Sequence, residues 1–188
     1  MRIEDVIKAI APICVVGEYG NREIQHLLTD SRTVKDDVRS TLFFALRTEK
    51  NDGANYIVSL LERGVRNFVV HTDFAYERWL SQYPDACLLV VNNTLDALQD
   101  LAAWKRHQYS CPVIGITGSN GKTVVKEWLY ELLKDDYKIT RSPKSYNSQI
   151  GVPLSVWTMN EETELAILRR EYRLLARWRS CKKSLILR

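Results

Sequence analysis

The stretch "VIGITGSNGKTVVKEW", residues 113 to 128, places a glycine-rich turn between two apolar segments. "VIGIT" is short, β-branched and uncharged, which is typical of a strand buried on both faces. After Gly121 the apolar residues recur at helical spacing and predict an amphipathic helix, with an apolar side formed by Val124, Val125, Trp128, Leu129, Leu132 and Leu133. Its other side is predicted to be polar, with Lys126, Glu127, Glu131 and Lys134. The glycines therefore lie in a turn that connects a strand to a helix.

Such a turn favours an anion, because the first N–H groups of a helix have no partner within it and the helix dipole adds positive potential. Glycines at 118 and 121 remove the Cβ atoms that would hold a phosphate away from these N–H groups. Lys122 is placed to reach the β and γ phosphates, and the Thr123 hydroxyl is placed to ligate Mg²⁺. We therefore predict a phosphate-binding loop for ATP or GTP, formed by Thr117, Gly118, Ser119, Asn120, Gly121, Lys122 and Thr123.

The loop matches the known glycine motifs only in part. In the P-loop pattern G-x-x-x-x-G-K-[ST] the first glycine falls on Ile116. The glycines at 115, 118 and 121 also do not fit the dinucleotide fingerprint G-x-G-x-x-G. The alternative is a glycine-rich turn with a functionless lysine. The position of "GKT" between a buried strand and a helix favours the nucleotide site over this alternative.

The rest of the chain alternates strand-like and helix-like segments, which predicts an α/β fold with largely parallel strands. Strands are expected at 41–46, 66–71, 87–91 and 113–117, and helices at 52–64, 73–82 and 93–107. "QYSCP" (108–112) marks an expected domain boundary. No apolar run approaches the roughly 18 residues that a membrane span needs, and no signal peptide is evident, so we expect a cytoplasmic protein. The four cysteines and three histidines are scattered and predict neither a metal site nor a disulfide framework.

The positive charge is confined to the end of the chain. Residues 169–188 hold eight Lys and Arg against one Glu, whereas residues 1–168 hold 19 basic and 22 acidic residues. A nucleic-acid-binding domain usually carries its positive charge across a folded face, so no nucleic acid partner is expected for residues 1–168.

Several blocks of sequence resemble the Mur ligase family. "TGSNGKT" (117–123) resembles the ATP loop of that family, and "RSPKSYNSQIGVPLSV" (141–156) resembles the segment that follows it. Upstream, the blocks "LLTDSR" (27–32), "LFFAL" (42–46), "NDGANYI" (51–57) and "GVRNFVV" (64–70) are similar to its amino-terminal uridine-nucleotide domain. The resemblance covers residues 1 to about 167. It implies a uridine-nucleotide domain at 1–108 and the beginning of a P-loop ATP-binding central domain at 109–167.

The resemblance is strongest to the members that add D-Ala-D-Ala to UDP-N-acetylmuramoyl-tripeptide in peptidoglycan synthesis, including forms fused to an alanine racemase. It implies ATP and Mg²⁺ as cofactors and an acyl phosphate as the intermediate. Asp30, Ser31 and Arg32 would lie against the uridine nucleotide, although "DSR" is also a common helix cap. Asn147 would lie in an active-site loop or cap the next helix. Thr48 and Ala54 stand where many relatives have Gly and His.

The resemblance ends after Ile167. The family's next strand should end in a Glu-x-Gly turn that supplies a Mg²⁺ ligand, but here "LRREYRLLARWRS" follows. A shifted reading frame compatible with residues 168–187 can encode a stretch similar to the family's continuation, so we interpret 168–188 as a frameshift product that forms a solvated or disordered tail. The chain is then expected to be inactive alone. The alternatives are a uridine-nucleotide binding module without turnover, a basic tail that binds nucleic acid or an anionic surface, and, more distantly, a folylpolyglutamate synthase.

Overall fold

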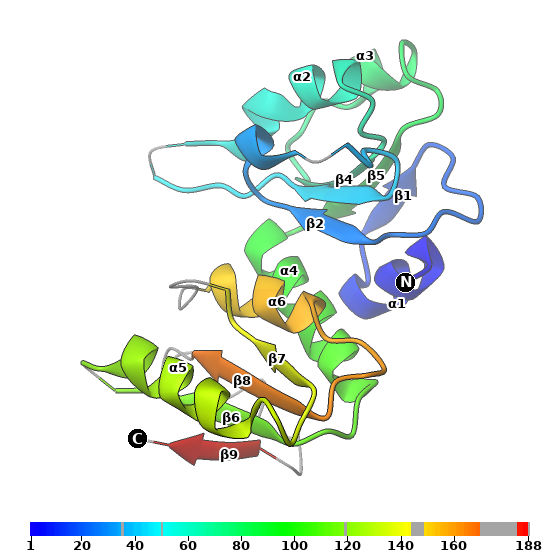
Figure 1. Cartoon of the computed structure of the whole chain (residues 1–188). Coiled ribbons are helices and arrows are strands. Elements are labelled where there is room, and N and C mark those ends of the chain that lie inside the picture. Colours follow the sequence, from blue (N-terminus) through cyan, green and yellow to red (C-terminus); the bar gives the residue numbers. More distant parts are fainter. Residues whose placement is uncertain (35, 50, 119, 144–148, 170–183, 188) are drawn as a thin grey trace. The chain divides into compact units, whose positions relative to one another are not determined.

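A computed structural model describes the chain apart from residues 35, 50, 119, 144–148, 170–183 and 188 (Figure 1). The chain divides into two compact units, Met1–Asp100 and Leu101–Arg188. The division falls within helix α4 (Thr94–His107). The boundary expected at 108–112 lies directly after this helix. Both units are mixtures of helices and largely parallel strands, so the predicted α/β class is confirmed.

The first unit is built on a five-stranded sheet in the order β1-β5-β4-β3-β2. Strands β2 to β5 are parallel, and β1 is antiparallel to β5. In chain order its elements are α1 (Ile3–Ile10), β1 (Cys14–Val16), β2 (His26–Leu28), η1 (Ser31–Thr33), β3 (Thr41–Phe44), η2 (Gly53–Tyr56), α2 (Ile57–Glu62), β4 (Asn67–His71), α3 (Glu77–Leu80), β5 (Cys87–Val91) and the start of α4.

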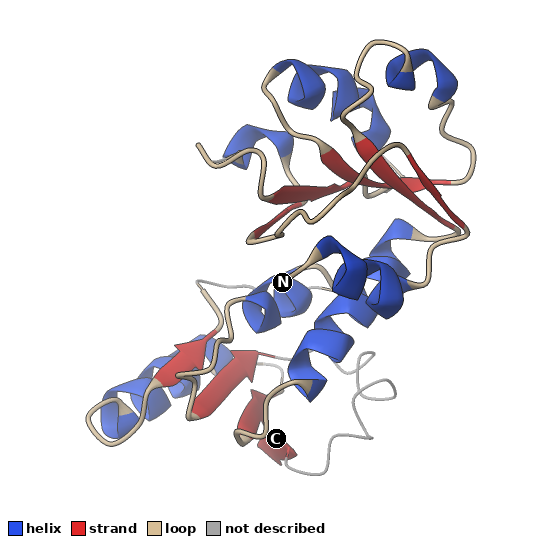
Figure 2. Cartoon of the chain, turned by 90° about the vertical axis from the view of Figure 1, so that its right-hand side faces the viewer, coloured by secondary structure: helices blue, strands red, loops and turns tan. Residues whose placement is uncertain are grey.

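The core of this unit follows from strands that are apolar on both faces. Phe43, Phe68 and Leu88 are neighbours on adjacent strands and point to the same face. There they pack with residues of α2, such as Leu60 and Leu61, in one buried cluster. The intervening strand residues, such as Val69, are also fully buried. Figure 2 shows helices over one face of these strands, and strands that are buried on both faces are typical of continuous apolar runs in a parallel sheet.

The second unit is built on a four-stranded parallel sheet in the order β7-β8-β6-β9. Its elements after α4 are β6 (Val113–Ile116), α5 (Lys122–Leu133), β7 (Ile139–Arg141), α6 (Gly151–Trp157), β8 (Leu165–Arg169) and β9 (Ser184–Leu187). Leu165 and Ile167 of β8 pack toward α5, whereas Ala166 and Leu168 pack toward α6. The two helices therefore cover opposite faces of the sheet. Strand β6 lies between β8 and β9, and the glycine turn follows its carboxyl end.

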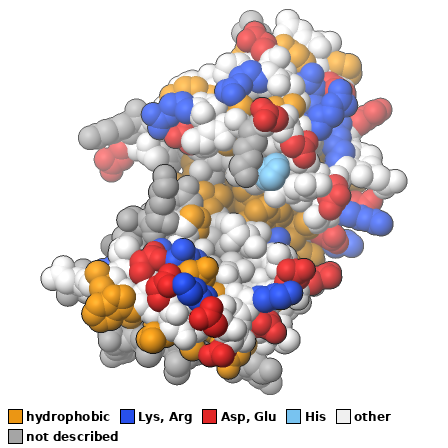
Figure 3. Space-filling view, in the orientation of Figure 1, with side chains coloured by type: hydrophobic (Ala, Val, Ile, Leu, Met, Phe, Trp, Pro, Cys, Tyr) orange, Lys and Arg blue, Asp and Glu red, His pale blue; other side chains and the backbone are white. Residues whose placement is uncertain are grey.

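Helix α5 differs from its sequence prediction in which side it buries. Leu129 and Leu133 pack on the sheet as expected. Trp128 and Leu132, however, are 67% and 74% exposed, whereas the side chain predicted to be polar and solvated, Lys126, is 1% exposed. Figure 3 shows orange side chains at the lower left, where α5 lies. The helix is apolar around more than half of its circumference, so periodicity alone did not identify the face that meets the sheet.

Residues 168–188 were expected to form a solvated or disordered tail. This expectation is wrong for the residues of that segment that the structure describes, 168, 169 and 184–187. Leu168 and Arg169 belong to β8, which pairs with β6 and β7. Residues Ser184–Leu187 form β9, which pairs in parallel with β6. Without β9, the N–H and C=O groups on that side of β6 would be unpaired, and an edge of this kind favours addition of a strand. These parts of the tail are therefore in the sheet.

Candidate functional site

The glycine turn of the second unit forms an open cradle at the end of β6. Gly118 has φ +134° and Gly121, the residue that precedes α5, has φ +75°. These backbone conformations are strained for residues with a Cβ atom. Apart from the adjoining residues of the chain, no atom of the described residues lies within 4 Å of the position that a Cβ would occupy at either glycine. The space beside the turn is therefore open, and side chains at these positions would enter it.

Helix α5 begins directly at this cradle. Its first backbone hydrogen bond runs from the Val125 N–H to the Gly121 carbonyl, at 2.9 Å. The N–H groups before this bond therefore lie at the open end of the helix, where the helix dipole is positive. The half-buried Lys122 donates from Nζ to the Gly118 carbonyl. An ammonium group and a helix N-terminus thus meet at one open turn, which fits the phosphates of a nucleotide.

The other residues of the predicted phosphate loop differ in exposure, and not all of them are described. Thr117 is half-buried, and Asn120 and Thr123 are exposed. Ser119 and Asn147 lie outside the described residues. The structure therefore brings Gly118, Gly121 and Lys122 together, with Thr123 one residue further into the helix.

The described residues supply only part of the protein side of a Mg²⁺ site. Strand β8, the neighbour of β6, places Leu168 beside Gly115 and Arg169 beside Ile116. Within the described residues, the strand end where a Mg²⁺-binding carboxylate is expected therefore carries Leu168 and Arg169 and no acidic residue. Among the residues that the structure describes, no group of three or more His, Cys, Asp or Glu is arranged to hold a metal. Thr123 remains the candidate ligand at this turn, and the donor set fits a triphosphate better than it fits the metal.

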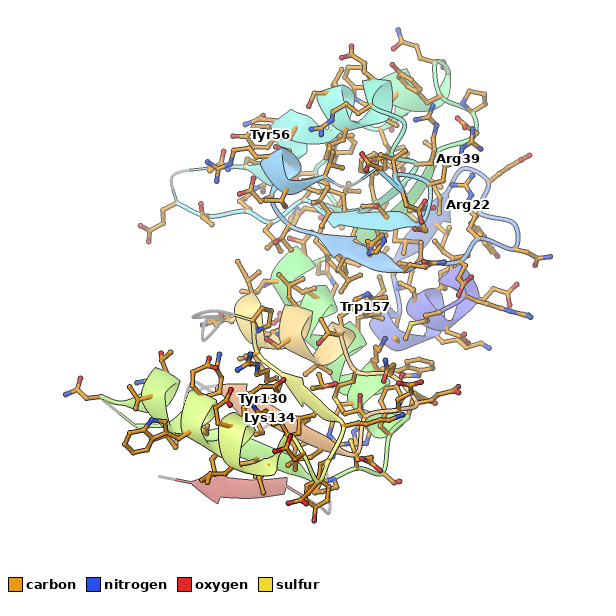
Figure 4. The ribbon with its side chains drawn as sticks, in the orientation of Figure 1. Arg22, Arg39, Tyr56, Tyr130, Lys134 and Trp157 are labelled. Carbon is orange, nitrogen blue, oxygen red and sulfur yellow. The ribbon has the colours of Figure 1, made fainter. Side chains whose placement is uncertain are left out.

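A second candidate site lies in the first unit, at the carboxyl ends of β2 and β3. A cavity of about 330 Å³ is lined by Thr29, Asp30, Ser31, Arg32, Phe43, Leu46, Asn51, Gly53 and Tyr56. The predicted Asp30, Ser31 and Arg32 thus lie together in its wall. Ligands of parallel α/β sheets commonly bind beyond the carboxyl ends of the strands. Figure 4 labels Tyr56, a half-exposed aromatic ring at this cavity that is available for stacking.

Internal hydrogen bonds hold the "DSR" turn in shape. The Asp30 carboxylate accepts from the Arg32 backbone N–H at 3.0 Å and forms an ion pair with the Arg32 guanidinium at 2.6 Å. Arg63 donates to the Ser31 carbonyl at 2.9 Å. The hydrogen bonds from Arg32 lower the pKa of Asp30 to about 2. Asp30 therefore caps η1 and also orients the Arg32 guanidinium at the cavity. The helix cap and the wall of the cavity are formed by the same residues.

The sequence blocks did not identify three further residues of this cavity. Tyr56 donates its hydroxyl to Asn51 Oδ1 at 3.1 Å. A Cβ on Gly53 would lie 2.8 Å from the Leu46 backbone nitrogen, so only glycine fits. The block "NDGANYI" contains all three residues, but residue type alone did not show which of them line a cavity.

The lowered pKa of Asp30 leads to a test of the "DSR" turn. Because the folded pKa lies below the ordinary value of 3.8, the stabilisation from this carboxylate is present above about pH 4 and is lost as the pH falls toward 2. We expect the Asp30 carboxyl carbon to titrate near pH 2 by NMR, and Arg32→Gln to move its midpoint toward 3.8. A midpoint near 3.8 in the unaltered chain would show that this ion pair does not form in solution.

Comparison with known proteins decides the family. Residues 116–169 match the Mur ligase middle domain. The UDP-N-acetylmuramoyl-tripeptide–D-alanyl-D-alanine ligase of Borreliella burgdorferi is 33% identical over 172 residues, which cover 89% of this chain and 37% of that protein. The chain belongs to the Mur ligase family. The corresponding ligase of Bacillus subtilis is 32% identical over 152 residues, 80% of this Mur ligase chain and 31% of that protein.

Solved Mur ligases have the same fold over most of the chain. MurF from Acinetobacter baumannii superposes with a TM-score of 0.77 and 26% identity, over 89% of this chain and 34% of that one. MurF ligase from Thermotoga maritima, solved in complex with ADP, superposes with a TM-score of 0.66 and 25% identity, over 84% and 35% of the two chains. This Mur ligase chain thus spans about a third of the length of the curated relatives it matches. In the part that the structure describes, no helix is long and apolar enough to cross a membrane.

Proposed function

We propose that the chain contributes the uridine-nucleotide site and the ATP phosphate loop of a cytoplasmic ligase that joins D-Ala-D-Ala to UDP-N-acetylmuramoyl-tripeptide. The open cradle at Gly118 and Gly121, with Lys122 bonded across it, carries this proposal. The similarity to ligases of this name over 89% of the chain supports it. We also propose the division into a uridine-nucleotide domain at 1–108 and the start of an ATP domain at 109–167. The frameshift origin of the tail and the fused alanine racemase remain predictions.

When bound, ATP supplies the phosphoryl group that converts the tripeptide carboxylate into an acyl phosphate, which the amine of D-Ala-D-Ala then attacks. The chain's own residues would position the phosphates and neutralise their charge. The N–H groups from Gly118 to Gly121 would hold phosphate oxygens, and Lys122 would neutralise the charge that develops during phosphoryl transfer. The Thr123 hydroxyl would be a Mg²⁺ ligand, and Asn147 would belong to the active-site loop.

The cavity of the first unit fits the uridine nucleotide. Arg32 is held at the wall by Asp30 and supplies positive charge for a diphosphate. Tyr56 supplies an aromatic face for a base. The ion pair with Asp30 fixes the guanidinium before a ligand arrives, so less side-chain entropy is lost on binding.

Calorimetry tests this function. We expect ATP and UDP-N-acetylmuramoyl-tripeptide each to bind to the chain, without release of phosphate, because the described strand end beside the loop carries Arg169 instead of a carboxylate. Failure of ATP to bind would refute the phosphate loop. Binding of the uridine nucleotide alone would favour the second candidate, a uridine-nucleotide module. ATP-dependent phosphate release would show that the chain is catalytic as it stands.

A basic-tail function is less well supported. Residues 184–187 pair with β6, so this part of the tail is used in the sheet. Salt-dependent binding to DNA or anionic lipid that disappears on deletion of 168–188 would nevertheless favour it.

A further inference from the structure

The buried lysine of α5 has a position that packing alone does not explain. Lys126 follows Lys122 by one helical turn, and its side chain is 1% exposed. A buried ammonium group costs free energy unless it is paired and hydrogen-bonded, whereas an apolar side chain would fill the same space without that cost. The lysine therefore marks a specific polar contact on the sheet-facing side of the helix.

That contact joins the helix to the exit of strand β7. Lys126 Nζ donates to the Ser142 carbonyl at 2.7 Å and lies 3.0 Å from Glu127 Oε1. Ser142 is itself fully buried, and its N–H donates to the Ile167 carbonyl of β8 at 3.1 Å. One carbonyl and one N–H of the same residue thus link α5, β7 and β8.

A second link runs beside the first. Glu127 also forms an ion pair with Arg141, the last residue of β7. The Arg141 guanidinium lies 3.7 Å from the centroid of the Tyr130 ring, one turn further along α5. Figure 4 labels Tyr130 and Lys134 on this helix. The second and third turns of α5 are therefore attached to the end of β7, through Lys126 to Ser142 and through Arg141 to Glu127 and Tyr130.

We propose that Lys126 is a positioning residue of the nucleotide site. By holding Ser142, it fixes the N-terminal turn of α5 against the exits of β7 and β8, so that the loop N–H groups and Lys122 are already in place when phosphates arrive. A hydrogen bond from a charged donor is stronger than a neutral one, and a helix transmits the constraint over one turn with little loss. This inference rests on the proposed ATP site.

The test compares Lys126→Met with Lys134→Met, a control that removes the lysine directly after the last residue of α5, whose side chain is 40% exposed. ATP affinity is measured by calorimetry, and amide exchange at Ser142 is followed by NMR with and without ATP. We expect Lys126→Met to weaken ATP binding about tenfold, as for loss of a hydrogen bond from a charged group. We also expect ATP to slow exchange at Ser142 in the unaltered chain and in the control, but not in Lys126→Met, because coupling between two sites is reciprocal.

A purely structural lysine would give a different result. Lys126→Met would then melt at a lower temperature, yet it would bind ATP within twofold of the unaltered chain and show the same slowing at Ser142. That result would overturn the proposal.

If Lys126→Met does not fold, Arg141→Met removes the neighbouring link, and a loss of about threefold in ATP affinity is expected. Unchanged affinity and unchanged slowing of exchange at Ser142 would overturn the proposal. If the unaltered chain does not bind ATP, the proposed function fails and this inference fails with it. If the unaltered chain binds ATP and the folded variants match it, only this inference fails.

Discussion

Lys122→Ala is expected to weaken ATP binding about 50-fold, which corresponds to roughly 2.3 kcal/mol. The variant removes the ammonium group at the cradle but keeps the glycines and the start of α5. Hydrogen bonds to charged groups contribute about 1.5–3 kcal/mol, and part of the phosphate affinity remains with the N–H groups of the helix. Isothermal titration calorimetry of ATP measures the change.

Lys134→Ala is the matched control for this variant. It removes a lysine near the end of the same helix, where the ion pair with Glu131 is exposed. Exposed pairs of this kind contribute little, so ATP affinity should stay within about twofold of that of the unaltered chain. Equal affinities for Lys122→Ala and the unaltered chain would contradict the assignment of Lys122 to the phosphates.

Phe43→Ala is expected to lower the free energy of unfolding of the first unit by about 3–5 kcal/mol. Phe43 is 1% exposed and packs edge to face against Phe68, with the ring centroids 6.2 Å apart. Its truncation loses apolar burial and leaves a cavity that close-packed neighbours fill only in part. Because Phe43 also lines the cavity beside Asp30, the variant should lose affinity for the uridine nucleotide as well.

Urea denaturation followed by circular dichroism measures the stability effect. Ile13→Ala is the control, since Ile13 is an apolar residue of the same unit that is 58% exposed. Its effect should lie within about 0.5 kcal/mol. A loss for Phe43→Ala no larger than that of the control would show that the sheet and helices do not pack as described.

The sequence predicted the strands that are long and apolar. Strands β4 and β5 are buried along most or all of their length, so continuous runs such as "CLLVV" identified them. Strands β1, β2 and β7 have three residues each, and the sequence analysis did not predict them. A run of three residues contains too little periodicity to distinguish a strand from a loop. Their positions are set by pairing with longer neighbours, which is tertiary information.

The sequence also predicted a glycine turn between a strand and a helix, which the structure has between β6 and α5, but not the way that helix packs. The assignment of Gly118, Gly121 and Lys122 to phosphates came from residue type and order, and it remains a prediction. Lys126 was assigned to the polar side of the helix because it falls between the apolar positions of the helical repeat. Its partner, the Ser142 carbonyl, is 16 residues away in the sequence and carries no side-chain signal. The same reasoning placed Trp128 in the core, where the structure instead exposes it.

The cavity of the first unit was predicted only in part. The family blocks singled out Asp30, Ser31 and Arg32, and the structure brings all three to one wall. Tyr56 reaches the same wall because the 3₁₀ turn η2 carries it there, and this turn depends on close contact between Gly53 and the backbone of Leu46. Contacts of this kind follow from the fold and are not visible in composition or spacing.

The central claim is that the phosphates of ATP bind at the turn between β6 and α5. The most direct measurement is the change in backbone amide chemical shifts on titration with ATP. We predict the largest changes at Gly118, Gly121 and Lys122, with saturation at one equivalent. Unchanged shifts at these three amides, or changes confined to the first unit, would contradict the claim.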